Sequence, residues 1–162
     1  MQQVARALSK WAEEKEKNGD YDVFGRSAFN RYYYASYLVV REMLLKLDSS
    51  WGKERHSKIP DLLKTTILRK IKNEIKKQAK AGFPRNEYLK DPNSAIIGLA
   101  DLMESAYKIR IDADYFPEKK VSFVNGKLIL SNTTLSSAEK WLNQTNRFTG
   151  EILTIWRQLG IS

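Results

Sequence analysis

The chain has 162 residues, enough for one domain with a substantial core, and a formal net charge of +9. It contains no cysteine and one histidine, His56, which excludes zinc fingers, iron–sulfur clusters, cysteine nucleophiles and disulfide scaffolds. No apolar run approaches the ~20 residues of a membrane span, and the N-terminus is too charged for a signal peptide. We therefore expect a single domain over residues 1–162, located in the cytoplasm, without a membrane contact, a metal ion or a cofactor.

The positive charge is concentrated in one segment. Residues 53–90 hold twelve Lys and Arg residues against four Asp and Glu residues, a net charge of +8, and the rest of the chain carries +1. Basic surface concentrated in one element favours a polyanionic partner more than a basic composition does. The alternative is a solvated helix face without a ligand.

The apolar spacing in the first half of the chain predicts helices. Val4, Leu8 and Trp11 indicate a first helix that ends at 18–20. A wide apolar stripe predicts a central second helix over 26–47. A third helix is expected to start near Pro60, and its core face is Ile59, Leu63, Ile67, Ile71 and Ile75.

Another face of that third helix is basic. Arg69, Lys72, Lys76 and Lys80 recur at helical spacing, so they can contact successive phosphates of a nucleic acid. We predict them as RNA-binding residues.

The second half of the chain predicts two more helices and a hairpin. Ser94 is the expected N-cap of a fourth helix that buries Ile97 and ends before Pro117. Asn125-Gly126 between two apolar runs predicts a β-hairpin over 121–130, because a type I′ turn requires positive φ at both central residues. Ser136–Glu139 resembles a capping box that opens a last helix.

Two unusual hexamers, 31–36 and 110–115, each place an arginine in an otherwise apolar helical stretch. A buried guanidinium requires a partner. Arg110 and Asp114 have the spacing of an intrahelical ion pair, and Arg31 could anchor Asp112 or Asp114. Consecutive tyrosines at 32–34 must point in three directions, so at least one ring belongs to the core while one phenol can face a ligand.

These motifs, in this order, resemble the HEPN superfamily, in particular its small standalone prokaryotic members. The similarity covers about residues 1–157. Five motifs carry it: Gly-x-Tyr-Asp at 19–22, Arg-x-Tyr-Tyr-Ala at 31–35, a helix start led by His at 56–59, Arg-x-x-Ala-Asp-Tyr at 110–115, and an Ala-Glu…Phe pattern at 138–148. It implies an antiparallel five-helix bundle, into which the hairpin at 121–130 is inserted. It also implies a homodimer, and Trp141 and Trp156 supply apolar surface for such an interface.

Many HEPN proteins are metal-independent endoribonucleases in which an Arg-x(4–6)-His motif holds the scissile phosphate and moves protons. Here Asp114 and Tyr115 occupy the stretch where that histidine would fall, and the sole imidazole is His56. The resemblance therefore implies Arg110, His56, Asp114 and Tyr115 as catalytic candidates, with Arg31 and Tyr34 as candidates for RNA or phosphate binding. His56 could equally be an exposed or capping residue.

Two hypotheses remain open. The first is a ribonuclease of a toxin–antitoxin or phage-defence system, with a nucleotidyltransferase or other antitoxin as partner; in related systems such a partner modifies the residue analogous to Tyr115. The second is a catalytically silent HEPN module that binds RNA, a nucleotide or a partner protein. The missing Arg-x(4–6)-His motif favours the second hypothesis, and the charge of residues 53–90 favours RNA under both.

Overall fold

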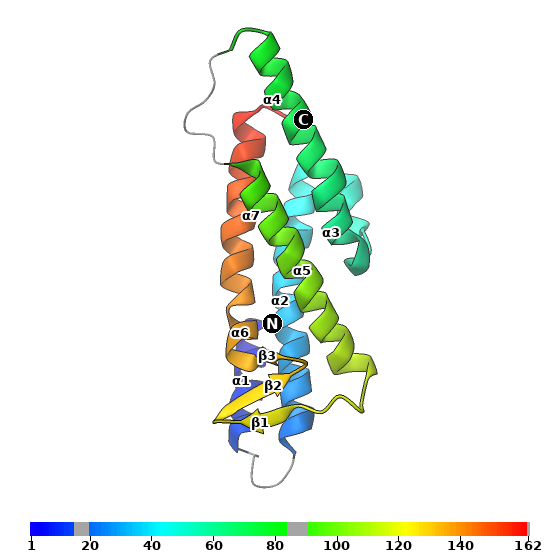
Figure 1. Ribbon diagram of the computed structural model, residues 1–162, viewed down its shortest axis with the longest axis vertical. Helices are drawn as coiled ribbons and strands as arrows, with labels where there is room; N and C mark the ends of the chain where they lie inside the picture. Colours follow the sequence, from blue (N-terminus) through cyan, green and yellow to red (C-terminus); the bar gives the residue numbers. More distant parts are fainter. Residues whose placement is uncertain (15–19, 84–90, 162) are drawn as a thin grey trace. The chain divides into compact units, whose positions relative to one another are not determined.

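A computed structural model describes residues 1–14, 20–83 and 91–161. In these ranges the chain is mostly helical and has a small three-stranded antiparallel sheet (Figure 1). No helix in this part of the chain is both long and apolar enough to cross a membrane. The predicted helical class is therefore confirmed.

The helices and strands have the following bounds: α1 Gln2–Glu14, α2 Tyr21–Leu47, the 3₁₀ turns η2 Ser49–Lys53 and η3 His56–Lys58, α3 Ile59–Asp61, the π-helical η4 Leu62–Ile67, α4 Leu68–Lys80, α5 Pro92–Tyr115, β1 Ser122–Val124, β2 Lys127–Leu130, β3 Thr133–Thr134, α6 Leu135–Glu139 and α7 Trp141–Gln158. The predicted stop at 18–20 and the motif at 19–22 lie in part outside the described residues.

The chain divides into two compact units. The first consists of Met1–Leu38 and Ser105–Gln144, and the second of Val39–Glu104 and Thr145–Ser162. The prediction of one domain stays a prediction.

In the first unit, α1 buries its small residues rather than the predicted stripe. Ala5 and Ala12 are fully buried, whereas Val4 and Trp11 are 51% and 50% exposed. Trp11 packs edge-on against Phe24 of α2, with 5.9 Å between the ring centres. The helix that Val4, Leu8 and Trp11 predicted is therefore confirmed, but the alanines next to Val4 and Trp11 face the core.

The predicted hairpin forms, with its turn at Asn125 and Gly126. Strands β1 and β2 pair antiparallel, with Val124 opposite Lys127, and the turn residues Asn125 and Gly126 have φ values of 49° and 72°. The sheet lies beside α6 (Figure 1). The third strand, β3, was not predicted.

Two helix starts differ from the prediction. The Asp91 carboxylate, and not Ser94, accepts hydrogen bonds from the backbone N–H groups of Asn93 and Ser94 at the start of α5. At the start of α6, the Thr134 hydroxyl and not that of Ser136 accepts from the N–H of Ser137. In both cases a residue just upstream reaches the unpaired amides that any helix start presents.

In the second unit, Ile59, Leu63, Ile67 and Ile71 are fully buried, as predicted, while Ile75 is half-buried. Ile97 is 40% exposed and its neighbour Ile96 is buried instead, so the predicted inward face of α5 is wrong at that position. Trp156 is also buried and meets Trp51 edge-on, with 6.1 Å between the ring centres.

Candidate functional site

The C-terminal end of α5 is held in the first unit by Arg26 of α2. Its guanidinium donates hydrogen bonds to the carbonyl oxygens of Asp112 (3.2 Å), Phe116 (3.2 Å) and Lys119 (2.6 Å). The Asp112 carbonyl lies in the last turn of α5, where partial negative charge accumulates, and those of Phe116 and Lys119 lie in the segment that follows the helix. Arg26 therefore caps α5, a role that sequence reasoning missed because its partners are about ninety positions away.

A second cation binds the same helix end. Lys119 Nζ lies 2.6 Å from Oδ1 of Asp112, whose side chain is 5% exposed. Burial alone would raise the pKa of Asp112, but the hydrogen bonds from Lys119 and Ser131 outweigh it and lower this pKa. Asp112 is thus a structural carboxylate, paired with Lys119 and not with Arg31.

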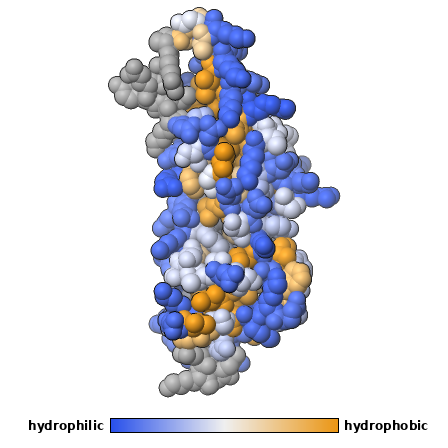
Figure 2. All heavy atoms as spheres, viewed as in Figure 1, coloured by the Kyte–Doolittle hydropathy of each residue, from blue (hydrophilic) through white to orange (hydrophobic). Residues whose placement is uncertain are grey.

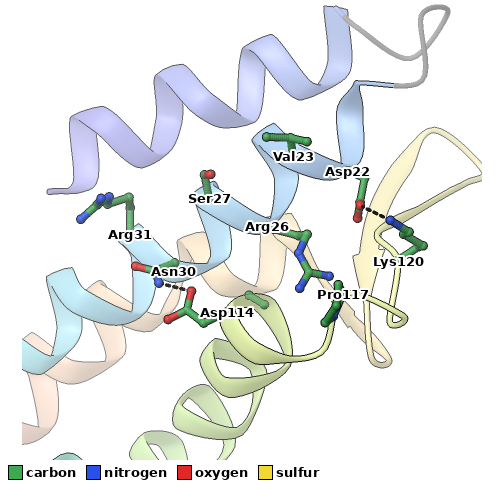
Figure 3. A pocket seen from close by; sticks show the side chains of 10 residues that line it. Asp22, Val23, Arg26, Ser27, Asn30, Arg31, Asp114, Pro117 and Lys120 are labelled. Atoms are coloured by element: carbon green, nitrogen blue, oxygen red, sulfur yellow. Dashed lines mark hydrogen bonds and ion pairs between the residues drawn. The ribbon is translucent and has the colours of Figure 1, made fainter.

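The two helices and the segment after α5 enclose a pocket of about 430 Å³, shown in Figure 3. Its polar wall includes two short pairs: Lys120 Nζ lies 3.3 Å from Oδ2 of Asp22, and Asn30 donates to Oδ1 of Asp114. Arg31 also lines this pocket; it is exposed and makes no hydrogen bond or ion pair with any residue that the structure describes. The anchoring of Asp112 or Asp114 by Arg31 is therefore wrong.

Arg110 lies next to the pocket. Its Nε is 2.9 Å from Oδ2 of Asp114, which confirms the expected ion pair one helical turn apart. The Nε–H does not point at that oxygen closely enough to form a hydrogen bond, and Nη2 donates to the Tyr34 hydroxyl at a long 3.4 Å. Burial would lower the pKa of Arg110, but the Tyr115 hydroxyl and the Asp114 charge raise it above its ordinary value, so this side chain is always a cation.

Two aromatic rings flank this cation. The Cζ of Arg110 is 5.8 Å from the centre of the Tyr34 ring and 5.1 Å from that of Tyr115. Both distances suit a cation–π interaction. The first unit thus brings together four of the predicted site residues, Tyr34, Arg110, Asp114 and Tyr115, and places Arg31 at the pocket wall.

Further tyrosines lie beneath Tyr34. Tyr33 is fully buried, and its ring contacts those of Tyr34 (5.6 Å between centres), Tyr37 (6.3 Å) and Tyr107 (5.9 Å). Tyr32 is buried as well, and its hydroxyl is 3.2 Å from that of Ser9. The expectation that at least one ring of the tyrosine run belongs to the core is confirmed, and the expectation that one phenol faces a ligand stays a prediction.

His56 opens η3 in the second unit and is half-buried. Arg110 belongs to the first unit, so the pairing of His56 with Arg110 stays a prediction. Among the described residues, no group of three or more His, Cys, Asp or Glu side chains could hold a metal ion.

The second unit contains the predicted basic face. Arg69, Lys72, Lys76 and Lys80 are all exposed on α4. At about 100° per residue they fall within an arc of about 80° on the helix. Hydrophilic side chains line the outer edge of α4 (Figure 2).

Other lysines of this unit already interact with acidic or aromatic side chains. Lys64 lies 2.8 Å from Asp101 and 3.3 Å from Glu104, Lys77 lies 3.4 Å from Glu74, and Lys70 lies over the ring of Trp51. The four residues of the basic face form no ion pair within the described ranges. They are therefore available to an external anion.

Comparisons with protein-family models, with curated proteins and with solved structures found no match to this chain.

Proposed function

We propose that this protein is a HEPN-type RNA-binding protein whose basic face on α4 contacts the phosphates of RNA. The observation that carries this proposal is the set of four exposed cations, Arg69, Lys72, Lys76 and Lys80, on one side of one helix. Their acidic neighbours are occupied by other lysines, so internal pairing does not explain them. The HEPN assignment rests on the sequence motifs, and the mostly helical fold supports it.

The test is a fluorescence anisotropy titration of a labelled single-stranded oligoribonucleotide. For wild type, log K should fall by about 0.7 times the number of phosphate contacts per log unit of salt. Changing all four basic-face residues to Glu should abolish binding. A matched control replaces four dispersed exposed lysines, Lys10, Lys46, Lys127 and Lys140, with Glu; it alters net charge equally and should bind far better than the basic-face variant. Equal loss in both variants, or no wild-type binding at low salt, would refute the proposal.

A second candidate is metal-independent RNA cleavage in a toxin–antitoxin or phage-defence setting, and the cluster around Arg110 favours it. Cleavage requires a cation on the phosphate, a proton acceptor and a proton donor. Arg110, Asp114 and Tyr115 supply these three groups from the last turns of α5. His56 is the one histidine of the chain, and an imidazole can both accept and donate a proton. The 63% exposure of Tyr115 also leaves it accessible to a modifying partner such as a nucleotidyltransferase.

Cleavage should persist in EDTA and leave a cyclic phosphate. His56→Ala and Arg110→Ala should each slow it by about 10²-fold or more. Full activity of His56→Ala would remove the histidine from the mechanism. RNA binding without cleavage would support the catalytically silent HEPN module.

A further inference from the structure

Phe83 presents an aromatic ring to solvent just beyond the C-terminal end of α4. It is 66% exposed, although phenylalanine is among the residues most often buried. Gly82 has φ of 79° and donates to the carbonyl oxygen of Ala79, and the Phe83 N–H donates to that of Gln78 at 3.1 Å. This is the Schellman arrangement, in which a left-handed glycine ends a helix. The backbone that carries the exposed ring is therefore held by the hydrogen bonds of the helix end.

Phe83 lines a pocket of about 460 Å³ that lies wholly in the second unit. Pockets of about 300–1,000 Å³ are typical of sites for small organic ligands. The other lining residues come from α4, its C-cap and the end of α7: Glu74, Lys77, Gln78, Ala81 and Gln158. An aromatic ring and a methyl group beside polar side chains suit a flat ligand that carries hydrogen-bonding groups at its edge.

Two side-chain amides of this pocket have hydrogen-bonding capacity that the fold does not use. Gln78 Nε2 donates to the Leu159 carbonyl oxygen at 2.9 Å and to Oε1 of Glu74 at 3.3 Å. These two bonds use both of its N–H groups and leave its Oε1 without a donor among the described residues. The Gln158 side chain makes no hydrogen bond with any residue in the described ranges. An acceptor and a donor beside an aromatic ring are the groups that recognise the edge and the face of an unpaired base.

The pocket adjoins the basic face of α4. Lys80, the last residue of that face, directly precedes Ala81 in the pocket lining. At about 100° per residue, Lys77 lies about 60° around the helix from Lys80, and Ala81 lies about 40° beyond Lys77. Lys77 is paired with Glu74 at 3.4 Å, which leaves Lys80 to bind a phosphate. A nucleotide whose phosphate is bound by Lys80 can therefore place its base in the pocket.

We propose that the pocket at Phe83 binds one unpaired base of the RNA strand whose phosphates lie along the basic face. The base stacks on the Phe83 ring, and Gln78 and Gln158 bind its edge. This inference rests on the proposed RNA binding and names single-stranded RNA as the ligand of that surface. A duplex can offer phosphates to the basic face, but its bases are stacked on one another and paired, so none can enter the pocket.

The stacking is tested by the removal of bases from the ligand and of the ring from the protein. Two labelled oligoribonucleotides of equal length are compared, one with all its bases and one with stable abasic residues throughout, so that both carry the same phosphates. Wild type should bind the strand with bases about fivefold or more tightly, the scale of one base stacked on an aromatic ring. Phe83→Leu should lose this preference and keep its affinity for the abasic strand, whereas Phe83→Tyr retains a ring and should retain the preference. No preference in wild type, or an undiminished one in Phe83→Leu, would overturn the stacking.

The contact with the base edge is tested with Gln158→Ala. Affinity for the strand with bases should fall by about threefold or more, the scale of one hydrogen bond, and affinity for the abasic strand should not change. Gln144→Ala is the matched control, because Gln144 is an exposed glutamine of the same helix that lies in the first unit. Equal effects of the two substitutions would overturn the role of Gln158.

The two proposals fail differently. If wild type binds the strands with and without bases equally well, and does so through the basic face, only the base pocket is refuted. If wild type binds neither strand at low salt, the proposed RNA binding is refuted together with it.

Discussion

Arg26 is a single side chain that serves three backbone carbonyls at the end of α5. The Phe116 oxygen also accepts from the Lys119 N–H at 3.0 Å, so Arg26 supplements a backbone hydrogen bond there. Because the capped segment also carries Asp112 and Asp114, the guanidinium fixes the helix end on which the candidate site is built.

Replacement of Arg26 by Met should therefore destabilise the fold. We expect the free energy of unfolding, measured in urea, to fall by about 2 kcal/mol, the scale of hydrogen bonds to a charged group. Arg31→Met is the control on the same helix; Arg31 is exposed, and its loss should change the free energy by no more than about 0.5 kcal/mol. Equal effects of the two substitutions would contradict the capping role.

Asp112 gives a pH dependence with a definite sign. Its pKa lies below the ordinary value of 3.8 in the folded protein, so folding favours the ionised carboxylate. Its contribution to stability is complete well above pH 3.8 and is lost as the pH falls through the lower pKa of the folded state.

Asp112→Asn should thus be less stable than wild type by about 1–3 kcal/mol at pH 7. The difference should shrink as the pH is lowered below 3.8, because the wild-type carboxyl then also becomes neutral. Urea unfolding at a series of pH values measures both quantities. A difference that does not change with pH would show that ionisation of Asp112 is not involved.

At the scale of elements, two glycines should respond in opposite ways to the same substitution. Gly126 has φ of 72° in the hairpin turn, where a Cβ is strained, whereas Gly150 lies in α7 with open space where a Cβ would point. Gly126→Ala should destabilise the protein by about 1–2 kcal/mol. Gly150→Ala should stabilise it by about 1 kcal/mol through helix propensity. Thermal unfolding of the two variants checks both signs, and the same sign in both would be inconsistent with this structure.

The elements that could be predicted from the sequence are those with local causes. Asn125 and Gly126 form a turn because both adopt positive φ readily. Arg110 and Asp114 meet because they are four positions apart on one helix. The exposure of the basic face of α4 follows from the helical spacing of its residues. The core face of α1 could not be predicted, since Val4 and Ala5 belong to adjacent apolar stripes and only the packing decides between them.

Partners far apart in the sequence were also not predictable. The carbonyls bound by Arg26, and the side-chain amide of Asn30 that holds Asp114, leave no spacing signal in the chain. For the same reason the sequence wrongly suggested Arg31 as a partner of Asp114, whose carboxylate binds Arg110 and Asn30. A polar residue one position away on α2, Asn30, was the better candidate for Asp114.

At the scale of the whole molecule, the proposed homodimer would need an interface other than Trp141 and Trp156. Trp141 and Trp156 are 6% and 5% exposed within the chain itself, so they supply no apolar interface area. Exposed apolar side chains lie in both units: Met1, Val4, Trp11 and Val23 of the first are each at least half exposed, and so is Phe83 of the second. The proposed homodimer would have to cover surface of this kind.

Light scattering at micromolar concentration should give about twice the 18.8 kDa chain mass if the homodimer forms. Trp11→Glu should shift the mass toward one chain if its exposed ring belongs to the interface, whereas Ile97→Glu, at a 40% exposed position of the second unit, should not. A single-chain mass for wild type would refute the dimer.

Ile59, Leu63, Ile67 and Ile71 are all buried although each is four positions from the next. In an α-helix a step of four residues overshoots one turn by about 40°, so three steps would carry the last side chain about 120° away from the first. The π-helical η4 turns less per residue and absorbs this drift. Deletion of one residue between 62 and 67 would restore ordinary winding, and eleven steps of about 100° would leave Ile71 only about 20° from the direction of Ile59. The π turn therefore takes up one residue without turning the helix that follows, and a related chain one residue shorter in that turn would still present its four cations to the same side.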